Sequence, residues 1–222
     1  MMEIIVSDEI KNICPGFVGA CIEASVSNGV YSETLWNEIL GFCKECRSNL
    51  TVGRLKEIPS IAATRAVYRL CGKDPSRYRP SAEALVRRVL KGGRLYQVNN
   101  IVDLTNLASM VYGYSIGAFD ADRFSGGKLV LGIGKHGEPY EGIGRGMVNI
   151  EGLPVYRDSK GGVGTPTTDN ERTKVEVATK RLAVLVNGYD GSEQGVTDTA
   201  EYIISLLSKY CSSEEATYHI YR

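Results

Sequence analysis

The sequence predicts an α+β protein in which mixed and antiparallel sheets are flanked by helices. Apolar residues recur at helical spacing in several segments of the first half of the chain. Glycines concentrate in the middle, and a buried-type strand followed by another helical pattern returns near the end. The 222 residues, 43% hydrophobic and 23% charged, can bury a sizeable core, and this composition excludes disordered and fibrous classes.

Local start and stop signals delimit the elements of the first half, which has α/β character. Ser32 is a preferred N-cap for the first long helix, Gly72 ends the next helix, and Pro80 opens the one after it. The elements predicted here are strands at residues 3–6 and 17–26 and helices at residues 36–46, 60–71, 81–91 and 101–112.

The middle of the chain has a different character. Fourteen of the 25 glycines lie between Gly113 and Gly164, separated by short apolar runs. This pattern is typical of antiparallel strands joined by tight turns. No repeat or linker interrupts the chain, so we expect one unit over residues 1–222. The elements predicted after residue 113 are strands at residues 128–133, 153–158, 182–186 and 216–222 and a helix around residues 200–207.

Charge and hydropathy narrow the possible partners. The 26 basic and 26 acidic residues give zero net charge, so we expect neither DNA nor non-specific nucleic-acid coating. No apolar run is long enough to span a membrane, and the N-terminus lacks the pattern of a signal peptide. We therefore expect a cytoplasmic protein without a membrane partner, whose six cysteines are reduced.

One segment is strongly basic. Between residues 76 and 99 the sequence holds six basic residues and a single acid, Glu83. The patch is either a solvated helix face or a contact for RNA phosphates. Its candidate RNA-binding residues are Arg77, Arg79, Arg87, Arg88, Lys91 and Arg94.

Two familiar motifs do not predict a cofactor or metal site. Residues 132–137 match G-x-G-x-x-G, but Pro139 and further glycines follow, so no helix can begin there to bind a pyrophosphate. Cys43 and Cys46 form a C-x-x-C inside a predicted helix, where two buried thiols are the expected interpretation.

His136 is either a turn residue or a general base, and His219 is expected to be structural. We expect no cofactor and no metal.

The polar segment 158–174 is the best candidate for catalysis. It concentrates hydroxyls, carboxylates and an arginine in a glycine-rich loop, the usual place for ligand-binding groups. It could bind an ammonium through Asp158 or Asp169, and its hydroxyls could orient a water. The alternative is an exposed loop whose polar residues serve its turns. The candidate catalytic residues are Asp158, Thr167 and Thr168, with Thr165 as a candidate substrate-binding residue.

Several stretches, taken in order, resemble one known family. These are YRPSAEALVRRVL at 78–90, NNIVDLTN at 99–106, GYSIGAFDADRFSGG at 113–127, Arg157-Asp158, and TTDNERT at 167–173. In this order they resemble the B3/B4 domain of the bacterial phenylalanyl-tRNA synthetase β subunit, and in particular its free-standing members. The resemblance covers residues 59–210, and residues 1–58 form an N-terminal α/β part that resembles the family more weakly.

The resemblance implies an editing activity. In the synthetase, this domain hydrolyses tyrosine wrongly esterified to the phenylalanine tRNA. A free-standing module would clear mischarged aminoacyl-tRNA in trans by positioning a water, without a protein nucleophile and without being a ligase. Its partners would be the tRNA 3′ end or an aminoacyl-tRNA and an amino-acid-like small molecule. The alternatives are a non-catalytic module that binds tRNA, other RNA or an amino acid, and a small-molecule enzyme or sensor.

The resemblance also implies a location for the pocket. It would lie between the helix at 99–106, a turn at 113–120 and the loop at 158–173. Asp120 and Arg172 would form a buried pair, and Glu138 or Glu141 would face the amino-acid side chain. The substrate-binding residues implied in this way are Asn100, Asp103, Asn106, Gly113, Gly117, Asp120, Glu138, Glu141 and Arg172.

Overall fold

The structure is a computed structural model that describes residues 1–213 and 215–222. Its helices are α1 (Asp8–Ile13), α2 (Glu33–Asn49), α3 (Pro59–Leu70), α4 (Ser81–Leu90), α5 (Asn100–Tyr112) and α6 (Glu193–Cys211), with short 3-10 helices η1 (Val52–Glu57), η2 (Ala121–Arg123) and η3 (Glu171–Thr173). Its strands are β1 (Glu3–Val6), β2 (Val18–Ser25), β3 (Ser115–Asp120), β4 (Lys128–Ile133), β5 (Glu141–Gly142), β6 (Gly146–Met147), β7 (Pro154–Asp158), β8 (Gly161–Gly164), β9 (Arg181–Gly188) and β10 (Thr217–Tyr221).

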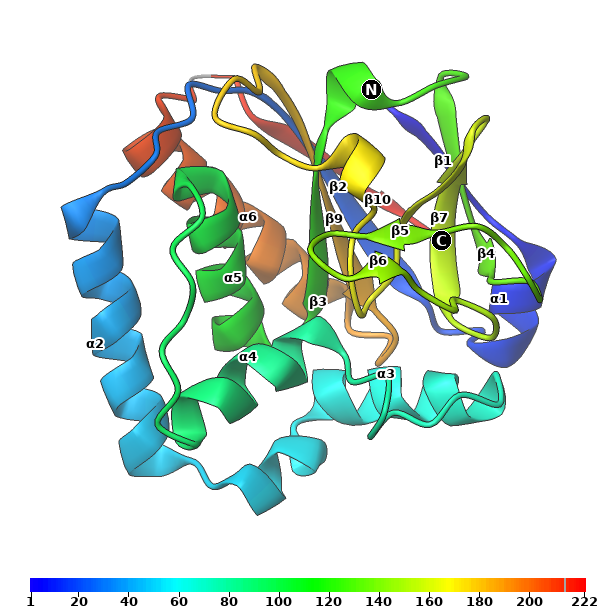
Figure 1. Ribbon diagram of the computed structural model, residues 1–222, viewed down its shortest axis with the longest axis horizontal. Coiled ribbons are helices and arrows are strands. Elements are labelled where there is room, and N and C mark those ends of the chain that lie inside the picture. Colours follow the sequence, from blue (N-terminus) through cyan, green and yellow to red (C-terminus); the bar gives the residue numbers. More distant parts are fainter. Residues whose placement is uncertain (214) are drawn as a thin grey trace.

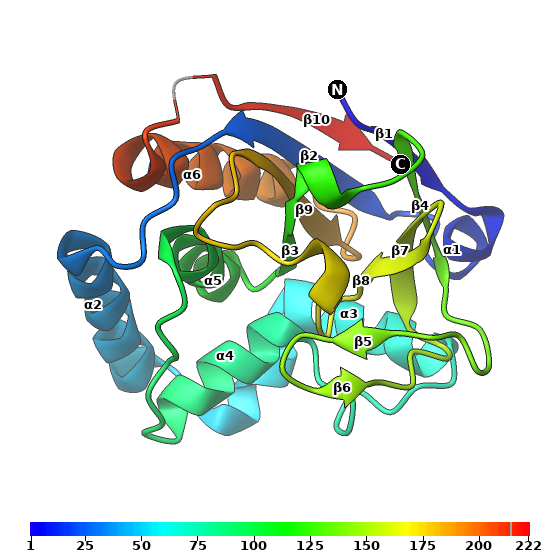
Figure 2. The same ribbon diagram turned by 45° about the horizontal axis from the view of Figure 1, so that its top comes forward.

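The strands form two four-stranded sheets, in the orders β10-β2-β9-β3 and β1-β4-β7-β8, and a small hairpin of β5 and β6. Figure 1 shows α2, α4, α5 and α6 gathered on one side of the first sheet, with the second sheet and α1 on its other side. Turning the molecule shows the same layers from above, with α3 running beneath the sheets (Figure 2). The mixed sheets and flanking helices confirm the predicted fold class.

The first sheet is the middle layer because strand residues alternate between its faces. From β2, Ala20 and Ile22 pack into the cluster shared with the helices. Cys21, between them in the strand, packs with Leu131 of the second sheet. Both faces of β2 and β9 are therefore buried, which explains their nearly continuous apolar sequences.

The capping predictions are confirmed. The Ser32 hydroxyl accepts from the Leu35 N–H at 3.3 Å, and Gly72 follows α3 with a φ of +76°. All six cysteines are free, with Cys43 and Cys46 buried in α2. No helix among the described residues is long and apolar enough to cross a bilayer.

The structure differs from the expected elements in three places. The predicted turn at 113–120 is strand β3, which pairs along its whole length with β9. β1 and β4 pair in parallel, which fits the predicted mixed sheets, although the glycine-rich middle by itself indicated antiparallel strands. The helix α1 was not predicted, because its six residues hold a single buried side chain, Ile10, and show no apolar periodicity.

Candidate functional site

A cavity of about 600 Å³ lies between α5, β3 and the chain segment at 174–177. Most of its wall is apolar, with Val98, Val102, Ile116, Val175 and Val177 contributing side chains. A mostly apolar hollow with a few convergent polar groups is the usual form of a small-ligand site. Its polar lining residues are Asn99, Thr105, Asn106, Asp169, Lys174 and Glu176.

Asp169 is one of the two carboxylate residues that line this cavity, the other being Glu176. Its Oδ2 accepts a hydrogen bond from the Ala118 N–H at 3.3 Å. Glycines on two strands leave room for the side chain, because a Cβ at Gly117 or Gly164 would lie 3.1 Å from Asp169 Oδ1. Burial raises the pKa of Asp169 from its ordinary 3.8 to about 8, and the Ala118 N–H opposes this only in part. The carboxyl therefore titrates near neutral pH.

A tight turn at 165–168 presents Asp169 to the cavity. The Thr165 hydroxyl accepts from the backbone N–H groups of Thr167 and Thr168, at 3.2 and 3.1 Å. The Thr165 N–H in turn donates to the Thr168 carbonyl oxygen at 3.1 Å. This use of a threonine hydroxyl to organise a turn fixes the backbone on which Asp169 stands.

Asn106 comes to the same cavity from α5. The helix begins at the N-cap Asn99, whose side chain accepts from the Val102 N–H at 3.0 Å. Two turns along the helix, Asn106 is half-buried and lines the cavity. Among residues 1–213 and 215–222 its amide makes no side-chain hydrogen bond, so both its donor and its acceptor are available to a ligand.

Charged groups at one side of the cavity neutralise one another. Lys174 pairs with Glu171 and lies 3.7 Å from Glu176, while Glu176 also pairs with Arg123. These pairs leave Asp169 as a cavity carboxylate that forms no ion pair within the described residues.

The structure brings some of the predicted site residues together. Asn106 lines the cavity, Gly117 lies beside it against Asp169, and Asp169 is one of the two carboxylates predicted to bind an ammonium. The other predicted residues of α5 lie elsewhere. Asn100 is buried and donates to the Tyr210 carbonyl oxygen at 3.4 Å.

Asp103 and Gly113 hold the fold rather than the cavity. Asp103 accepts from Trp36 Nε1 at 2.8 Å and from the Val98 N–H at 3.1 Å, which ties α5 to α2. Burial raises the pKa of Asp103, which these two hydrogen bonds oppose. Gly113 ends α5 in the left-handed conformation. Neither residue lines the cavity.

Asp158 lies outside the cavity in a fully paired position. Its side chain is completely buried, and its two oxygens accept from the Arg172 guanidinium at 2.9 and 3.0 Å. The backbone N–H groups of Ser125 and Lys160 donate to the same carboxylate at 2.9 and 2.8 Å. This set of partners joins β7 to the segments around it and leaves the carboxylate no free lone pair directed at a ligand.

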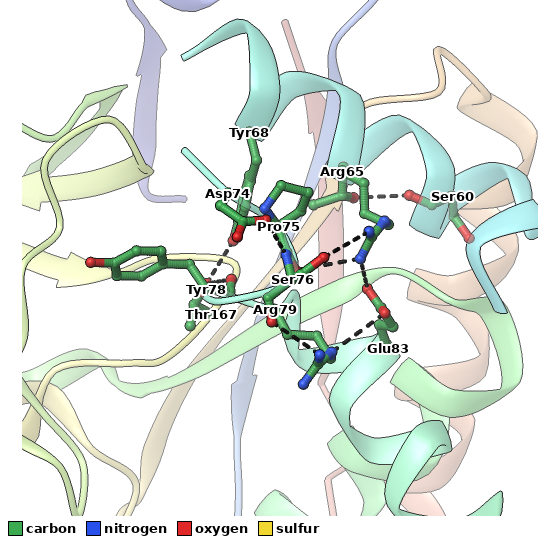
Figure 3. Close-up of polar contacts among 11 residues, drawn as sticks. Ser60, Arg65, Tyr68, Asp74, Pro75, Ser76, Tyr78, Arg79, Glu83 and Thr167 are labelled. Atoms are coloured by element: carbon green, nitrogen blue, oxygen red, sulfur yellow. Dashed lines mark hydrogen bonds and ion pairs between the residues drawn. The ribbon is translucent and has the colours of Figure 1, made fainter. Parts of the chain in front are cut away.

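The two threonines predicted to be catalytic also lie outside the cavity. Thr167 is buried, and its hydroxyl contacts the Tyr78 carbonyl oxygen and the Tyr68 hydroxyl, each at 2.8 Å (Figure 3). The Thr168 hydroxyl donates to the Asp169 carbonyl oxygen at 3.4 Å. Their roles in the structure are to hold the turn that carries Asp169.

The predicted pair of Asp120 and Arg172 is wrong. Arg172 pairs with Asp158 instead. Asp120 accepts from the Thr179 hydroxyl at 2.9 Å and lies 3.5 Å from Arg123. Asp120 also caps η2, so its position is set by local backbone N–H groups that sequence spacing did not reveal.

The predicted specificity carboxylates also lie away from the cavity. Glu138 forms a two-pronged pair with Arg157, with Nε–Oε1 and Nη2–Oε2 distances of 2.6 and 2.7 Å. Glu141 is exposed on β5. Neither is among the residues that line the cavity.

The basic patch is not one continuous surface. Arg77 is exposed and lies over the Tyr78 ring, whereas Arg79 turns inward toward Glu83. Arg88 donates to the Arg94 carbonyl oxygen at 2.7 Å and lies over the Tyr96 ring. Arg87 is half-buried, and Lys91 and Arg94 are exposed.

One group of potential metal ligands was not predicted. The donor atoms of Cys21, Glu23 and His219 lie within 4.8 Å of one another, away from the cavity. Burial raises the pKa of the Cys21 thiol to about 12 and lowers the pKa of His219. Glu23 accepts from the Met2 N–H at 2.8 Å. The trio contributes nothing to the cavity described above.

Sequence reasoning missed the segment 174–177 and Val98 as walls of the cavity. Val175 and Val177 alternate with the charged residues Lys174 and Glu176, and of the two valines Val175 is buried and Val177 is exposed at the cavity. The T-P-T-T-D sequence at 165–169 is the signal that could have separated Asp169 from Asp158, because a threonine-organised turn presents the residue that follows it.

The fold defines an α+β domain with a mostly apolar cavity, and comparison with known proteins places it in a family. The profile of the B3/4 domain matches residues 63–212, so the chain belongs to the B3/4 domain family. The family resemblance seen in the sequence is confirmed.

Two relatives are phenylalanine–tRNA ligase β subunits. The subunit of Geobacter metallireducens is 38% identical over 101 residues, which cover 42% of this chain and 12% of the relative. The subunit of Oceanobacillus iheyensis is 40% identical over 53 residues, which cover 24% of this chain and 6% of the relative. The chain thus matches a small part of each relative.

A solved structure shares the fold. It is an N-terminal fragment of the phenylalanyl-tRNA synthetase β subunit from Pyrococcus horikoshii, with a TM-score of 0.53 and 14% sequence identity. The similarity covers 96% of this chain and 50% of the fragment.

Proposed function

We propose that the cavity binds the aminoacyl end of a mischarged aminoacyl-tRNA and hydrolyses its ester in trans. The observation that carries this proposal is the Asp169 carboxyl, whose pKa is raised to about 8 in a cavity that also holds the unpaired Asn106 amide. Membership in the B3/4 domain family and the tRNA ligase subunits among the relatives support the choice of substrate.

Each part of an aminoacyl ester has a complementary group in the cavity. The apolar wall of valines and Ile116 suits an amino-acid side chain, and the Asn106 amide can hydrogen-bond to the ester or its ammonium. Asp169 in its ionised form takes a proton from water as the water oxygen attacks the ester carbonyl. Collapse of the adduct breaks the bond to the ribose oxygen, which takes that proton from Asp169 and becomes a hydroxyl, and leaves a free amino acid and an intact tRNA.

A water nucleophile fits the remaining chemistry of the chain. Burial raises the pKa of every cysteine thiol, so none is predisposed to act as a thiolate. His136 lies on an exposed turn beside Glu151, outside the cavity. Asp169 is the group whose pKa is suited to proton transfer near neutral pH.

The test is deacylation of a panel of mischarged tRNAs that includes tyrosine on the phenylalanine tRNA. We expect turnover above the buffer rate, rising with pH toward a plateau above about pH 8. Asp169→Asn should lower turnover at least tenfold, about 1.4 kcal/mol of barrier, while binding of the substrate persists. Glu45→Gln, which changes an exposed carboxylate of α2 that does not line the cavity, is the matched control and should leave turnover unchanged.

Two results would contradict hydrolysis at this cavity. Equal turnover by the wild type and Asp169→Asn would remove the carboxyl from the mechanism. Binding of tRNA or amino acid without turnover of any ester in the panel would favour the non-catalytic binding module.

A further inference from the structure

A second pocket, of about 330 Å³, lies between η1, α3, α4 and the segment before α4. It shares no lining residue with the cavity of Asp169. Four cationic side chains and one carboxylate line it, together with the Ser76 hydroxyl group and the small surface of Gly53. The charged lining residues are Lys56, Arg65, Arg79, Arg87 and Glu83.

The centre of this pocket is a partly buried triad of two arginines and one glutamate, whose charges do not balance. Glu83 Oε2 lies 2.7 Å from Arg65 Nη1, and its Oε1 lies 3.4 Å from Arg79 Nε. Figure 3 shows both guanidinium groups converging on this carboxylate from α3 and from the segment before α4. The side chains of Arg65 and Glu83 are 11% and 6% exposed, whereas that of Arg79 is 31% exposed, so the net positive charge of the triad is open to solvent on the Arg79 side.

The two arginines also have unused donors. Arg65 as a residue is 9% exposed, and its Nε has no hydrogen-bond partner within the described residues. The Arg79 Nε is likewise buried and lacks a hydrogen bond of good geometry. A buried guanidinium N–H without an acceptor is costly, and an excess of buried positive charge is costly as well. An anion in the pocket would offset the excess positive charge, and the remaining guanidinium N–H groups and the cations at the pocket wall could donate to it.

Two more cations line the pocket without competing partners. Lys56 comes from η1 and Arg87 from α4, one turn beyond Glu83. Neither forms an ion pair with any residue in the ranges 1–213 and 215–222. By contrast, Arg54 beside the pocket is paired with Glu57, at 3.5 Å. The uncompensated charge is therefore concentrated on residues that line the hollow.

We propose that this pocket binds a phosphoryl group. A phosphate presents several acceptor oxygens in a tetrahedral arrangement, which suits donors that approach from η1, α3 and α4 at once. Arginine is the side chain best matched to phosphate because its N–H groups are fixed in a fork. The phosphoryl group can belong to an RNA backbone or to a small phosphorylated molecule, and both sources share this chemistry.

The first experiment measures phosphate binding directly. Inorganic phosphate and pyrophosphate are titrated by calorimetry and by thermal unfolding, against chloride at matched ionic strength. We expect both probes to bind and to raise the melting temperature. The double variant Lys56→Ala/Arg87→Ala should weaken binding at least tenfold, because both residues line the pocket and neither supports a structural ion pair.

The matched control removes the same residue types elsewhere. Lys44 of α2 and Arg69 of α3 are exposed and do not line the pocket. Lys44→Ala/Arg69→Ala should bind phosphate as the wild type does. The proposal is overturned if phosphate acts no differently from chloride, or if both double variants lose affinity equally.

A second arm identifies the source of the phosphoryl group. Binding of tRNA is measured over a range of salt concentrations for both double variants. If the pocket takes a tRNA phosphate, the pocket variant alone should bind tRNA more weakly and with a shallower salt dependence. If tRNA binding is unchanged while pyrophosphate binding is lost, a small phosphorylated molecule is the ligand. Asp169→Asn should retain phosphate binding in either case, which separates this site from the proposed hydrolysis.

Discussion

Replacing Asp169 by Asn should make the protein more stable at alkaline pH, although this residue is the centre of the proposed active site. Asn keeps the size of the side chain and an oxygen that can accept from the Ala118 N–H, but it cannot ionise. In the wild type the carboxyl has a pKa of about 8 in the folded protein, against an ordinary value of 3.8. The substitution therefore removes a group that opposes folding whenever it is ionised.

The direction and size of the effect follow from this difference in pKa. The unfolded chain releases the proton near pH 3.8, whereas the folded protein holds it up to about pH 8. The free energy of unfolding of the wild type consequently falls as pH rises through this window. Between pH 4 and pH 9 the loss amounts to about 5 kcal/mol, roughly half of it by pH 6. The Asn variant does not lose this part of its unfolding free energy, because its side chain cannot ionise.

The assay is urea denaturation of both proteins from pH 4 to pH 9. Other titrating groups are common to the two proteins and cancel in the difference between their unfolding free energies. We expect that difference to grow with pH in favour of Asp169→Asn and to level off above about pH 8. A difference that stays constant over the whole range would show that the carboxyl is not desolvated, and the reasoning for the catalytic site would fail with it.

Two further substitutions test the structural roles assigned above. Asp158→Asn should lower the unfolding free energy, measured by urea denaturation, by about 3 kcal/mol because it leaves Arg172 without its charged partner. A loss below about 1 kcal/mol would contradict the structural role of Asp158. Gly113→Ala should lower the melting temperature more than Gly144→Ala does. Both glycines have a positive φ, so the backbone conformation disfavours alanine at each of them. At Gly113 an added Cβ would also lie 2.5 Å from Ser60 Oγ, whereas at Gly144 it would meet no described atom within 4 Å. Equal melting temperatures of these two variants would contradict the close packing at Gly113.

The sequence predicted the longer helices α2 to α6, although not α1, because their signals are local. Ser32 caps its helix through its own hydroxyl, and Gly72 and Gly113 end theirs with positive φ. The buried strand at 182–186 was equally clear, since both of its faces are covered and its sequence is continuously apolar.

Strand pairing depends on partners that are distant in sequence. The parallel pairing of β1 with β4 joins Glu3 to Lys128, and no local pattern encodes it. The strand β3 was mistaken for a turn because it contains Gly117 and follows Gly113. Gly117 is needed there for another reason: a Cβ would lie 2.6 Å from the Phe119 ring and 3.1 Å from the Asp169 carboxylate.

The sequence named both Asp158 and Asp169 in one candidate segment but did not show which of them lines the cavity, and the reason is competition for cations. Asp120 lies near Arg123. Asp158 forms an ion pair with Arg172 and also accepts hydrogen bonds from two backbone N–H groups. Asp169 is left with a single backbone donor and no cation within the described residues, so burial raises its pKa instead of a partner lowering it. Arg172 points to Asp158 and not to Asp169, and this choice, which leaves the Asp169 carboxyl without a cation among the described residues, is made by tertiary packing.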